Sequence, residues 1–553
     1  MKKAAAVLSV FLLTLAFWAP CARYRLVNYD DSDYVFDNAH VLGGLSPANV
    51  KWAWTDTRQA ANWHPLTWMS LQLDVSLSGM KVRPVGKTPN FETAAFDRIS
   101  SVMHVHNALL HALNAALLLV LVLLLLGRCG GAGTLRPAGG FPEIAVVALA
   151  VLVWAVHPLR AEAVAWVSER KEVLSAFFML LTLIAHVWMR SSMGLVLALL
   201  LYALALAAKP VAVSLPAVIF AIDWCFGGKP RWGRAGAFAA LAAGCVALTL
   251  LAQREVIEGS YLTFRERLPN VLAAFGTYGW QTIFPVRLSL MYPVLDRLDM
   301  AMTFASVMAL GGAWAMRENR LVRFAAAWIV VGLLPMIGIL QVGCQAHADR
   351  YTYWVGCGLT TVLALASCVC ASKMSRRAQM ALVAVWLAAA AIYGALGWRQ
   401  RDAWRDTEHV FGMSYRNVPC PMSATAYAQA VKTHDRDMAE SIYREARAKF
   451  PDDAFTISQL ALFLAVNRPA DRFAEAVALA QEALSLDPEC SFAFEALGFV
   501  AVRGGDFVEA EKRFLQAIER GSDSPAVRQG LDNARKGLAA AAGPLRIKGE
   551  PLP

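Results

Sequence analysis

Four aspartates lie close together near the start of the chain: Asp30, Asp31, Asp33 and Asp37. They follow the first apolar stretch, residues 4–20. A carboxylate within hydrogen-bond reach of a hydroxyl serves as a general base, and a neighbouring carboxylate raises its pKa. The cluster is therefore a candidate for base catalysis or for holding a divalent cation. A simple solvated loop is the alternative.

A second charged segment, HPLRAEAVAWVSERKE at residues 157–172, lies between two apolar stretches. Charges close to hydrocarbon are costly unless they pair or line a cavity. The segment is therefore either an interfacial helix held by Trp166 or a loop that lines a substrate site. Its titratable residues are His157, Arg160, Glu162, Glu169, Arg170, Lys171 and Glu172.

Two isolated basic residues, Lys209 and Arg350, lie at the edges of other apolar stretches. A phosphate beside a bilayer needs a compensating cation, so both residues suit the phosphate of a lipid-linked substrate. The alternative for each is a side chain that snorkels to the membrane interface.

The spacing of the histidines and the absence of known motifs argue against several classes of site. The spacing of His106 and His111 is poor for a shared helix face, so we expect packing or hydrogen bonding rather than a metal site. The 10 cysteines include no CxxC pair, and neither a zinc ribbon nor a disulfide framework is visible. No HExxH, Walker loop, GxGxxG after a strand, or GxSxG elbow occurs.

The elements that position these residues are apolar helices. Hydrophobic residues make up 57% of the chain and charged residues only 17%, below the roughly 25% of soluble domains. A bilayer is therefore part of the solvent of this protein. Candidate spans lie near residues 4–20, 105–126, 144–158, 172–189, 193–208, 210–226, 236–252, 300–316, 322–340, 354–372 and 379–398.

Topology follows from the positive-inside rule. If residues 269–285 do not cross, six basic clusters fall on the cytoplasmic side, and the polar segments above share the outer face. This predicts eleven spans, with the N-terminus inside, the C-terminus outside and an uncleaved first helix. The six clusters are Lys2/Lys3, Arg128/Arg136, Arg190, Lys229/Arg231/Arg234, Arg317/Arg320/Arg323 and Lys373/Arg376/Arg377.

The last part of the chain repeats with a period of about 34 residues, which is typical of tetratricopeptide helix pairs. Small alanines allow two helices to approach closely, while an aromatic residue fills the groove between pairs. Three units are recognisable, and the first is degenerate. The repeated positions are Ala439, Tyr443, Ala446 and Pro451; Ala476, Ala480, Ala483 and Pro488; and Ala510, Phe514 and Ala517, with Leu497 and Gly498 following Phe494.

The predicted fold class is therefore all-α, a polytopic membrane bundle followed by an α-solenoid. We expect a membrane-embedded domain at residues 1–400 with a large outer loop at 21–103. A linker at 401–419, the repeats at 420–535 and a tail at 536–553 complete the organisation.

Taken together, these segments resemble the transmembrane and tetratricopeptide-repeat O-mannosyltransferase family and its bacterial homologues. The resemblance rests on YDDSDYVFDN, NWHPLTWMSLQLD, HNALLHALNA, HPLRAEAVAWVSERKEVLS, AKPVAVSLP and ADRYTY, in this order, before the repeats. It implies a GT-C glycosyltransferase fold and transfer of mannose or another hexose from a polyprenyl-phosphate donor. A bacterial inner membrane with the repeats on the periplasmic side is the implied location.

The resemblance also implies roles for individual residues. An acidic residue of the first outer loop is the catalytic base, which here matches Asp30 or Asp31, with Asp30 preferred. The implied substrate-binding and donor-binding residues are His64, His157, Arg160, Glu162, Glu169, Arg170, Lys209 and Arg350. No cofactor is required, and a divalent cation at the aspartates is left open.

The implied acceptor is a hydroxyl of a protein or of an envelope glycan, with the repeats as a candidate binding surface for it. No nucleic-acid partner is implied. The segment at 80–101 lengthens the first loop relative to the family. The identity of the acceptor is therefore the property that the resemblance predicts least well. Two alternatives remain: a non-enzymatic scaffold for envelope complexes, and a polysaccharide ligase or transporter. Charged residues at span edges rather than mid-membrane favour surface chemistry over transport.

Overall fold

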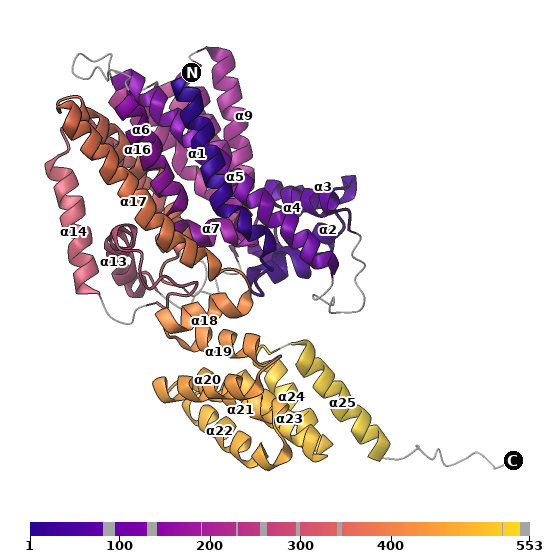
Figure 1. Cartoon of the computed structure of the whole chain (residues 1–553). Coiled ribbons are helices and arrows are strands. Elements are labelled where there is room, and N and C mark those ends of the chain that lie inside the picture. The colour runs from indigo at the N-terminus through magenta and orange to yellow at the C-terminus, as the bar shows by residue number, and fades with distance from the viewer. Residues whose placement is uncertain are drawn as a thin grey trace, which may run out of the picture. The chain divides into compact units, whose positions relative to one another are not determined.

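A computed structural model describes residues 1–80, 94–129, 141–189, 191–227, 231–254, 263–294, 299–339, 345–522 and 524–541. Within these ranges every regular element is a helix, and the only pairing of extended backbone is an isolated bridge between Pro293 and Gln345. The chain divides into two compact units, Met1–Val410 and Phe411–Pro553 (Figure 1). Most of the inserted segment 80–101 and the predicted cytoplasmic residues Arg136, Arg190 and Lys229 lie outside the described residues.

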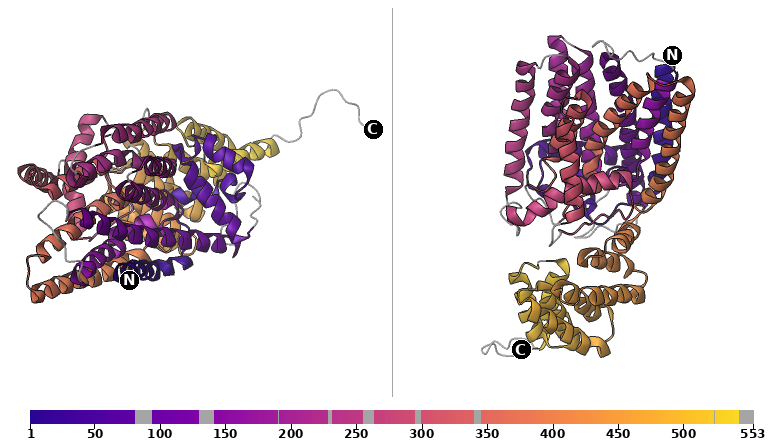
Figure 2. Two further views of the ribbon diagram at one scale, coloured as in Figure 1. Left: turned by 90° about the horizontal axis from the view of Figure 1, so that it is seen from above. Right: turned by 90° about the vertical axis from the view of Figure 1, so that its left-hand side faces the viewer.

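The first unit is a bundle of apolar helices, many of which run alongside one another (Figure 2). Their described members are α1 (Lys2–Trp18), α5 (Ala94–Cys129), α6 (Phe141–Val156), α8 (Arg170–Trp188), α9 (Ser192–Ala208), α10 (Leu215–Ile222), α11 (Trp232–Ala252), α14 (Met300–Ala315), α15 (Arg320–Leu333), α16 (Thr352–Ala371) and α17 (Arg376–Asp402).

Several of these helices have the length and composition of membrane spans. Seven described segments qualify singly, and the bent pair Pro142–Val156 and Pro158–Ala165 adds an eighth if it forms one span. The helices α9 and α14 are apolar but shorter. The chain therefore has the helices of a membrane protein, while the predicted total of eleven crossings and their sidedness stay predictions.

The doubtful segment 269–285 falls in α13 (Phe264–Ile283), which is not among the segments that qualify as spans. Figure 1 looks along the axis of α13, whereas α14 runs up the page and α17 crosses it obliquely. The amide of Gly276 donates to Ser306 Oγ on α14 at 2.7 Å. A Cβ at Gly276 would lie 2.1 Å from the carbonyl oxygen of Met302, so only glycine permits this close helix contact.

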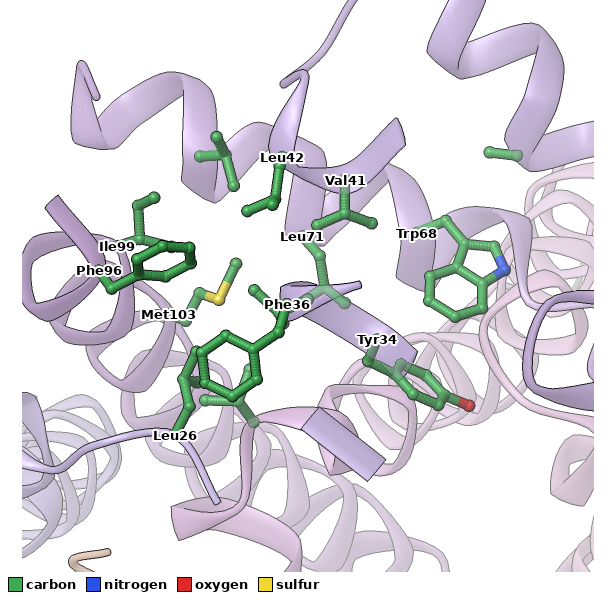
Figure 3. Close-up of a cluster of buried hydrophobic side chains, with 14 residues drawn as sticks. Leu26, Tyr34, Phe36, Val41, Leu42, Trp68, Leu71, Phe96, Ile99 and Met103 are labelled. Atoms are coloured by element: carbon green, nitrogen blue, oxygen red, sulfur yellow. The ribbon is translucent and has the colours of Figure 1, made fainter. Parts of the chain in front are cut away.

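Short helices of the first outer loop form a small lobe. They are α2 (Ala39–Leu42), α3 (Pro47–Thr55) and α4 (Pro65–Ser78). Figure 3 shows Phe36, Phe96 and Met103 gathered in the core of this lobe, so the start of α5 completes it. The aspartate segment that precedes Phe36 is thereby fixed to the bundle rather than left as a free loop.

Polar contacts also tie the apolar helices together. His111 on α5 lies 2.7 Å from the hydroxyl of Tyr353 and 2.9 Å from the carbonyl oxygen of Ala155. His106 lies 2.7 Å from Asp74 on α4. Both histidines therefore make polar contacts between elements of the bundle. Among the described residues, no group of three or more His, Cys, Asp or Glu side chains is placed to hold a metal.

The second unit consists of stacked helix pairs. Residues 401–419, predicted as a linker, hold the end of α17 and the helix α18 (Thr407–Asn417). The repeated alanines at 439, 476, 480, 483, 510 and 517 are buried, as close helix packing requires. The helices are α19 (Pro421–Val431), α20 (Arg436–Lys449), α21 (Ala454–Asn467), α22 (Phe473–Leu486), α23 (Ser491–Gly504), α24 (Phe507–Glu519) and α25 (Pro525–Ala541).

Replacing Gly498 by alanine should destabilise the last helix pair. A Cβ there would lie 2.8 Å from the ring of Phe514, which is fully buried and also faces Gly530. Overpacking of this kind costs about 1–3 kcal/mol. Hydrogen exchange on the intact protein should show faster exchange of α23 and α24 amides in Gly498→Ala. The matched control is Gly504→Ala, where a Cβ meets no atom within 4 Å; equal effects of both changes would contradict the packing argument.

Candidate functional site

Polar segments that are far apart in the sequence meet at one end of the first unit. The backbone amide of Ser168 donates to Asp31 at 2.9 Å, which joins the first outer loop to the segment at 157–172. Lys209 and Arg350 both contact Glu169 of that segment. Four of the segments predicted to share one face therefore meet at one end of the bundle.

Asp31 is a buried tie between the two loops. Its carboxylate accepts hydrogen bonds from the amide of Val27 at 2.7 Å and from the amide and hydroxyl of Ser168. Burial raises the pKa of Asp31 to about 7, although the donors from Ser168 and Val27 oppose that shift. Because its side chain is fully buried, Asp31 is placed to hold the loop.

Asp30, by contrast, presents its carboxylate at the surface of the same site. Its side chain is 39% exposed, and its Oδ2 lies 3.9 Å from Nζ of Lys171. The predicted acidic pair therefore splits into two unlike members. Of the two, only Asp30 has a solvent-accessible carboxylate with a cation beside it.

Glu169 is the centre of a buried ionic network. Its Oε1 lies 3.0 Å from Nζ of Lys171 and 3.3 Å from Nε of Arg350, and its Oε2 lies 3.2 Å from Nζ of Lys209. Lys209 also donates to Glu172 at 2.5 Å. One carboxylate thus contacts cations from three separate parts of the chain.

Glu162 extends this network at Arg350. Its carboxylate accepts a hydrogen bond from the backbone amide of Arg350 at 2.7 Å. The same carboxylate forms an ion pair with the guanidinium of Arg350. Buried ion pairs persist only when their geometry repays the cost of desolvation, and here each carboxylate has a cationic partner. Three glutamates therefore balance the cations Lys171, Lys209 and Arg350.

Interruptions in helices place these charges at helix ends. Glu169 ends a short 3-10 turn (Val167–Glu169) between α7 (Ala161–Ala165) and α8. Lys209 has extended backbone at the end of α9, where the next residue is Pro210. Arg350 lies in the turn Asp349–Tyr351 before α16. Each break turns a side chain toward the same end without placing a charge in mid-helix.

Aromatic rings line the network. Nζ of Lys171 lies 4.4 Å from the centre of the Tyr34 ring, and the Arg350 guanidinium lies 5.6 Å from that of Trp166. Trp166 in turn packs against Tyr29 and Trp404. Cations over aromatic faces keep their charge in a poorly hydrated place.

His64 lies beside this network as a buried neutral imidazole. Burial and the positive charges of Lys171 and Lys209 hold its pKa well below the usual range. Its Nδ1 lies 3.5 Å from the hydroxyl of Tyr34. The predicted substrate-binding residue His64 is thus close to the cations, as a hydrogen-bonding group rather than a charge.

Three predicted donor-binding residues lie elsewhere. Arg170 points away from the network to Asp74, at 2.7 Å, and Arg160 donates to the carbonyl oxygen of Thr352 at 3.0 Å. His157 contacts the carbonyl oxygen of Thr282 at 3.0 Å. These contacts join helices, and the donor-binding roles of the three residues stay predictions.

Lys171 and Glu172 join the network, although their neighbour Arg170 was the one predicted to bind the donor. All three are neighbours at the start of α8, and successive residues point about 100° apart around a helix. The spacing of Glu169 and Glu172 predicts a shared helix face for these two glutamates, but it does not distinguish Arg170 from Lys171. A further buried contact, from the Tyr292 hydroxyl to Asp349 at 2.8 Å, supports the turn that carries Arg350.

The second unit has a site of a different kind. A groove of about 580 Å³ is lined by residues of α19, α21, α23 and α25 and by Tyr443. Its aromatic lining residues are Tyr443, Phe455, Phe463, Phe492 and Phe499. Amide and charged side chains, among them Gln459, Lys432 and Glu495, border these rings. Such a lining suits an extended chain segment, which offers both apolar side chains and backbone hydrogen-bonding groups.

Comparison with known proteins adds little. No family model matches the chain, and no curated protein matches it. A solved structure to which it is similar is the crystal structure of the P58(IPK) TPR domain, at 13% sequence identity and a TM-score of 0.21. The match covers 66% of this chain and 99% of that one. A likeness at this score carries no argument about function.

Removing the charge of Lys209 should destabilise the first unit because Glu172 and Glu169 lose a buried cation. Breaking a buried pair typically costs about 3–5 kcal/mol. We expect Lys209→Met to lower the thermal unfolding midpoint in detergent, and Glu172→Gln in the same chain to restore part of the loss.

The control for this prediction is an exposed ion pair of the second unit. Lys449 lies 2.7 Å from Glu445, and both side chains are about half exposed. Lys449→Met should cost about 1 kcal/mol or less. Similar midpoints for Lys209→Met and Lys449→Met would contradict the buried network.

Proposed function

We propose that this protein is a membrane glycosyltransferase that moves a hexose from a polyprenyl-phosphate donor to a hydroxyl of a protein or glycan acceptor. The observation that carries the proposal is the position of Asp30, an accessible carboxylate at the edge of a buried network of cations. Perturbed, paired charges in one place are typical of functional sites. Span-forming helices beside that network bring it within reach of a lipid-linked substrate.

In the proposed reaction Asp30 takes the proton of the acceptor hydroxyl. The acceptor oxygen forms a bond to the anomeric carbon, and the bond from that carbon to the phosphate oxygen breaks. Attack from the face opposite the phosphate inverts the sugar configuration. The polyprenyl phosphate leaves with the bonding electron pair, so negative charge grows on its oxygen and needs stabilisation.

Lys209 and Arg350 are the proposed partners of that phosphate, together with Lys171. The glutamates hold these three cations in fixed positions, and their side chains keep about a tenth of their surface exposed. A preorganised cation stabilises developing charge without having to reorient. Because glutamates and cations balance, the site accepts an anionic phosphate through hydrogen-bond donors rather than through a large net positive charge.

A transporter and a scaffold are less well supported. The network lies at helix ends, whereas a transporter needs ionisable groups along a path through the middle of the spans. A scaffold accounts for the groove of the repeats and for stabilising ion pairs, but not for an accessible carboxylate beside them. We assign the groove to the acceptor, and we assign the network to the outer face of a bacterial inner membrane.

Asp30→Asn should reduce sugar transfer by about a hundredfold or more, because proton removal typically contributes that much. Donor binding and the unfolding midpoint should stay close to wild type, since Asp30 is exposed. Asp33→Asn is the matched control, because Asp33 is also exposed and lies in the same loop. Its effect should be mild.

The buried neighbour Asp31 separates two explanations for such a loss. Asp31→Asn should lower activity and stability together, because the ties to Ser168 and Val27 weaken. Wild-type transfer in Asp30→Asn would show that the aspartate loop has no catalytic role, and the scaffold would then be the better proposal.

The donor should be lipid-linked. Purified protein should turn over a polyprenyl-phosphate hexose, and Arg350→Lys should weaken its use by about tenfold or more because a charge-assisted contact is altered. The measurement is transfer of radiolabelled hexose from the lipid donor and, separately, from a nucleotide hexose without lipid. Turnover of the nucleotide hexose alone would contradict this assignment.

A further inference from the structure

Among the residues that the structure describes, the helix α4 carries a partly exposed apolar stripe. Leu66, Met69, Leu73 and Leu77 follow one another at spacings of three and four residues, which places them along one side of the helix. Leu73 is 37% exposed and Leu77 is 65% exposed. A row of large apolar side chains at a surface marks an interaction site more often than scattered single residues do.

The opposite side of α4 is fully occupied. Trp68, Leu71 and Val75 lie in the core of the lobe, where Figure 3 shows Trp68 and Leu71. Asp74, between Leu73 and Val75, is completely buried. The helix therefore keeps a charge inside and leucines outside, which is the reverse of the pattern on a water-exposed helix. Met69 also packs against the edge of this core, whereas Leu73 and Leu77 are exposed and lie outside it.

The contacts of α4 show at which level along the helices α5 and α9 it lies. Asp74 lies 2.7 Å from His106, and the exposed apolar residues Val105 and Leu109 flank that histidine on α5, within a span-forming segment. The hydroxyl of Thr67 donates to the carbonyl oxygen of Ala208, the last residue of α9, at 2.9 Å. Figure 1 shows α4 running across the page beside the end of α9, which runs up it.

We propose that α4 is an interfacial helix whose stripe of Leu66, Met69, Leu73 and Leu77 contacts membrane lipid. Helices of this kind bury an apolar face at the boundary between headgroups and acyl chains. Lipid is the occupant because the stripe lies at the level where α5 exposes Val105 and Leu109. The inference rests on insertion of the first unit in a bilayer and is independent of sugar transfer.

An anchored α4 also has a consequence for the lobe. Its buried face holds Ser70 and Asp74 against Arg170, and Arg170 directly precedes Lys171 of the ionic network. Lipid contact on one side of α4 therefore holds the lobe at the level of the network, where a lipid-linked phosphate would arrive.

The test is photo-crosslinking of the intact protein in nanodiscs of phosphatidylcholine and phosphatidylglycerol. Benzoylphenylalanine replaces Leu77 in one variant and Leu73 in another, and mass spectrometry identifies the adducts. We expect phospholipid adducts at both positions. Adducts to another part of the chain or to a second copy would overturn the proposal, as would an unreacted probe.

Two controls separate the possible failures. The same probe at Leu387, which is 57% exposed on α17, should label lipid if the bundle spans the bilayer. The probe at Leu515, 39% exposed in the second unit, should give no lipid adduct. Lipid labelling at Leu387 without labelling at Leu73 or Leu77 would refute the interfacial position of α4 alone. Loss of labelling at Leu387 would refute membrane insertion itself.

Discussion

The charge of Glu169 is the constraint on which this end of the bundle depends. An ionised carboxylate in a buried place needs cationic partners, and Glu169 takes them from its own segment, from the end of α9 and from the turn before α16. Removing one partner leaves this buried carboxylate with less compensation for its lost hydration. The spacing of three helices is therefore coupled to one side chain.

The proposed chemistry follows from this coupling. Ser168 precedes Glu169 and donates to Asp31, so the network also fixes the loop that carries Asp30. Lys171, which pairs with Glu169, is in turn the cation near Asp30. A general base, the cations for a leaving phosphate and the ends of apolar helices are thus held together by the same set of ion pairs. This arrangement supports transfer from a lipid-linked donor better than it supports transport or scaffolding.

Much of the architecture was predictable because it follows from local patterns. Apolar length predicted the helices of the first unit, and the repeated alanines predicted the helix pairs of the second. The shared end of the polar segments followed from counting basic residues in the loops. Individual partners were not predictable, as Arg170 and Lys171 illustrate: they are adjacent in the sequence, yet one meets Asp74 and the other meets Glu169. That choice depends on where α4 packs, which no local pattern encodes.

The most direct test is a cryo-electron microscopy structure of the protein in nanodiscs with a polyprenyl-phosphate hexose. The account predicts donor phosphate within about 3 Å of nitrogen atoms of Lys209 or Arg350, the usual hydrogen-bond distance, with the sugar toward Asp30. A donor bound at the opposite end of the bundle, near Arg128 and Arg234, would contradict the account. So would a donor-bound structure in which Lys209 and Arg350 contact only their glutamates and not the phosphate.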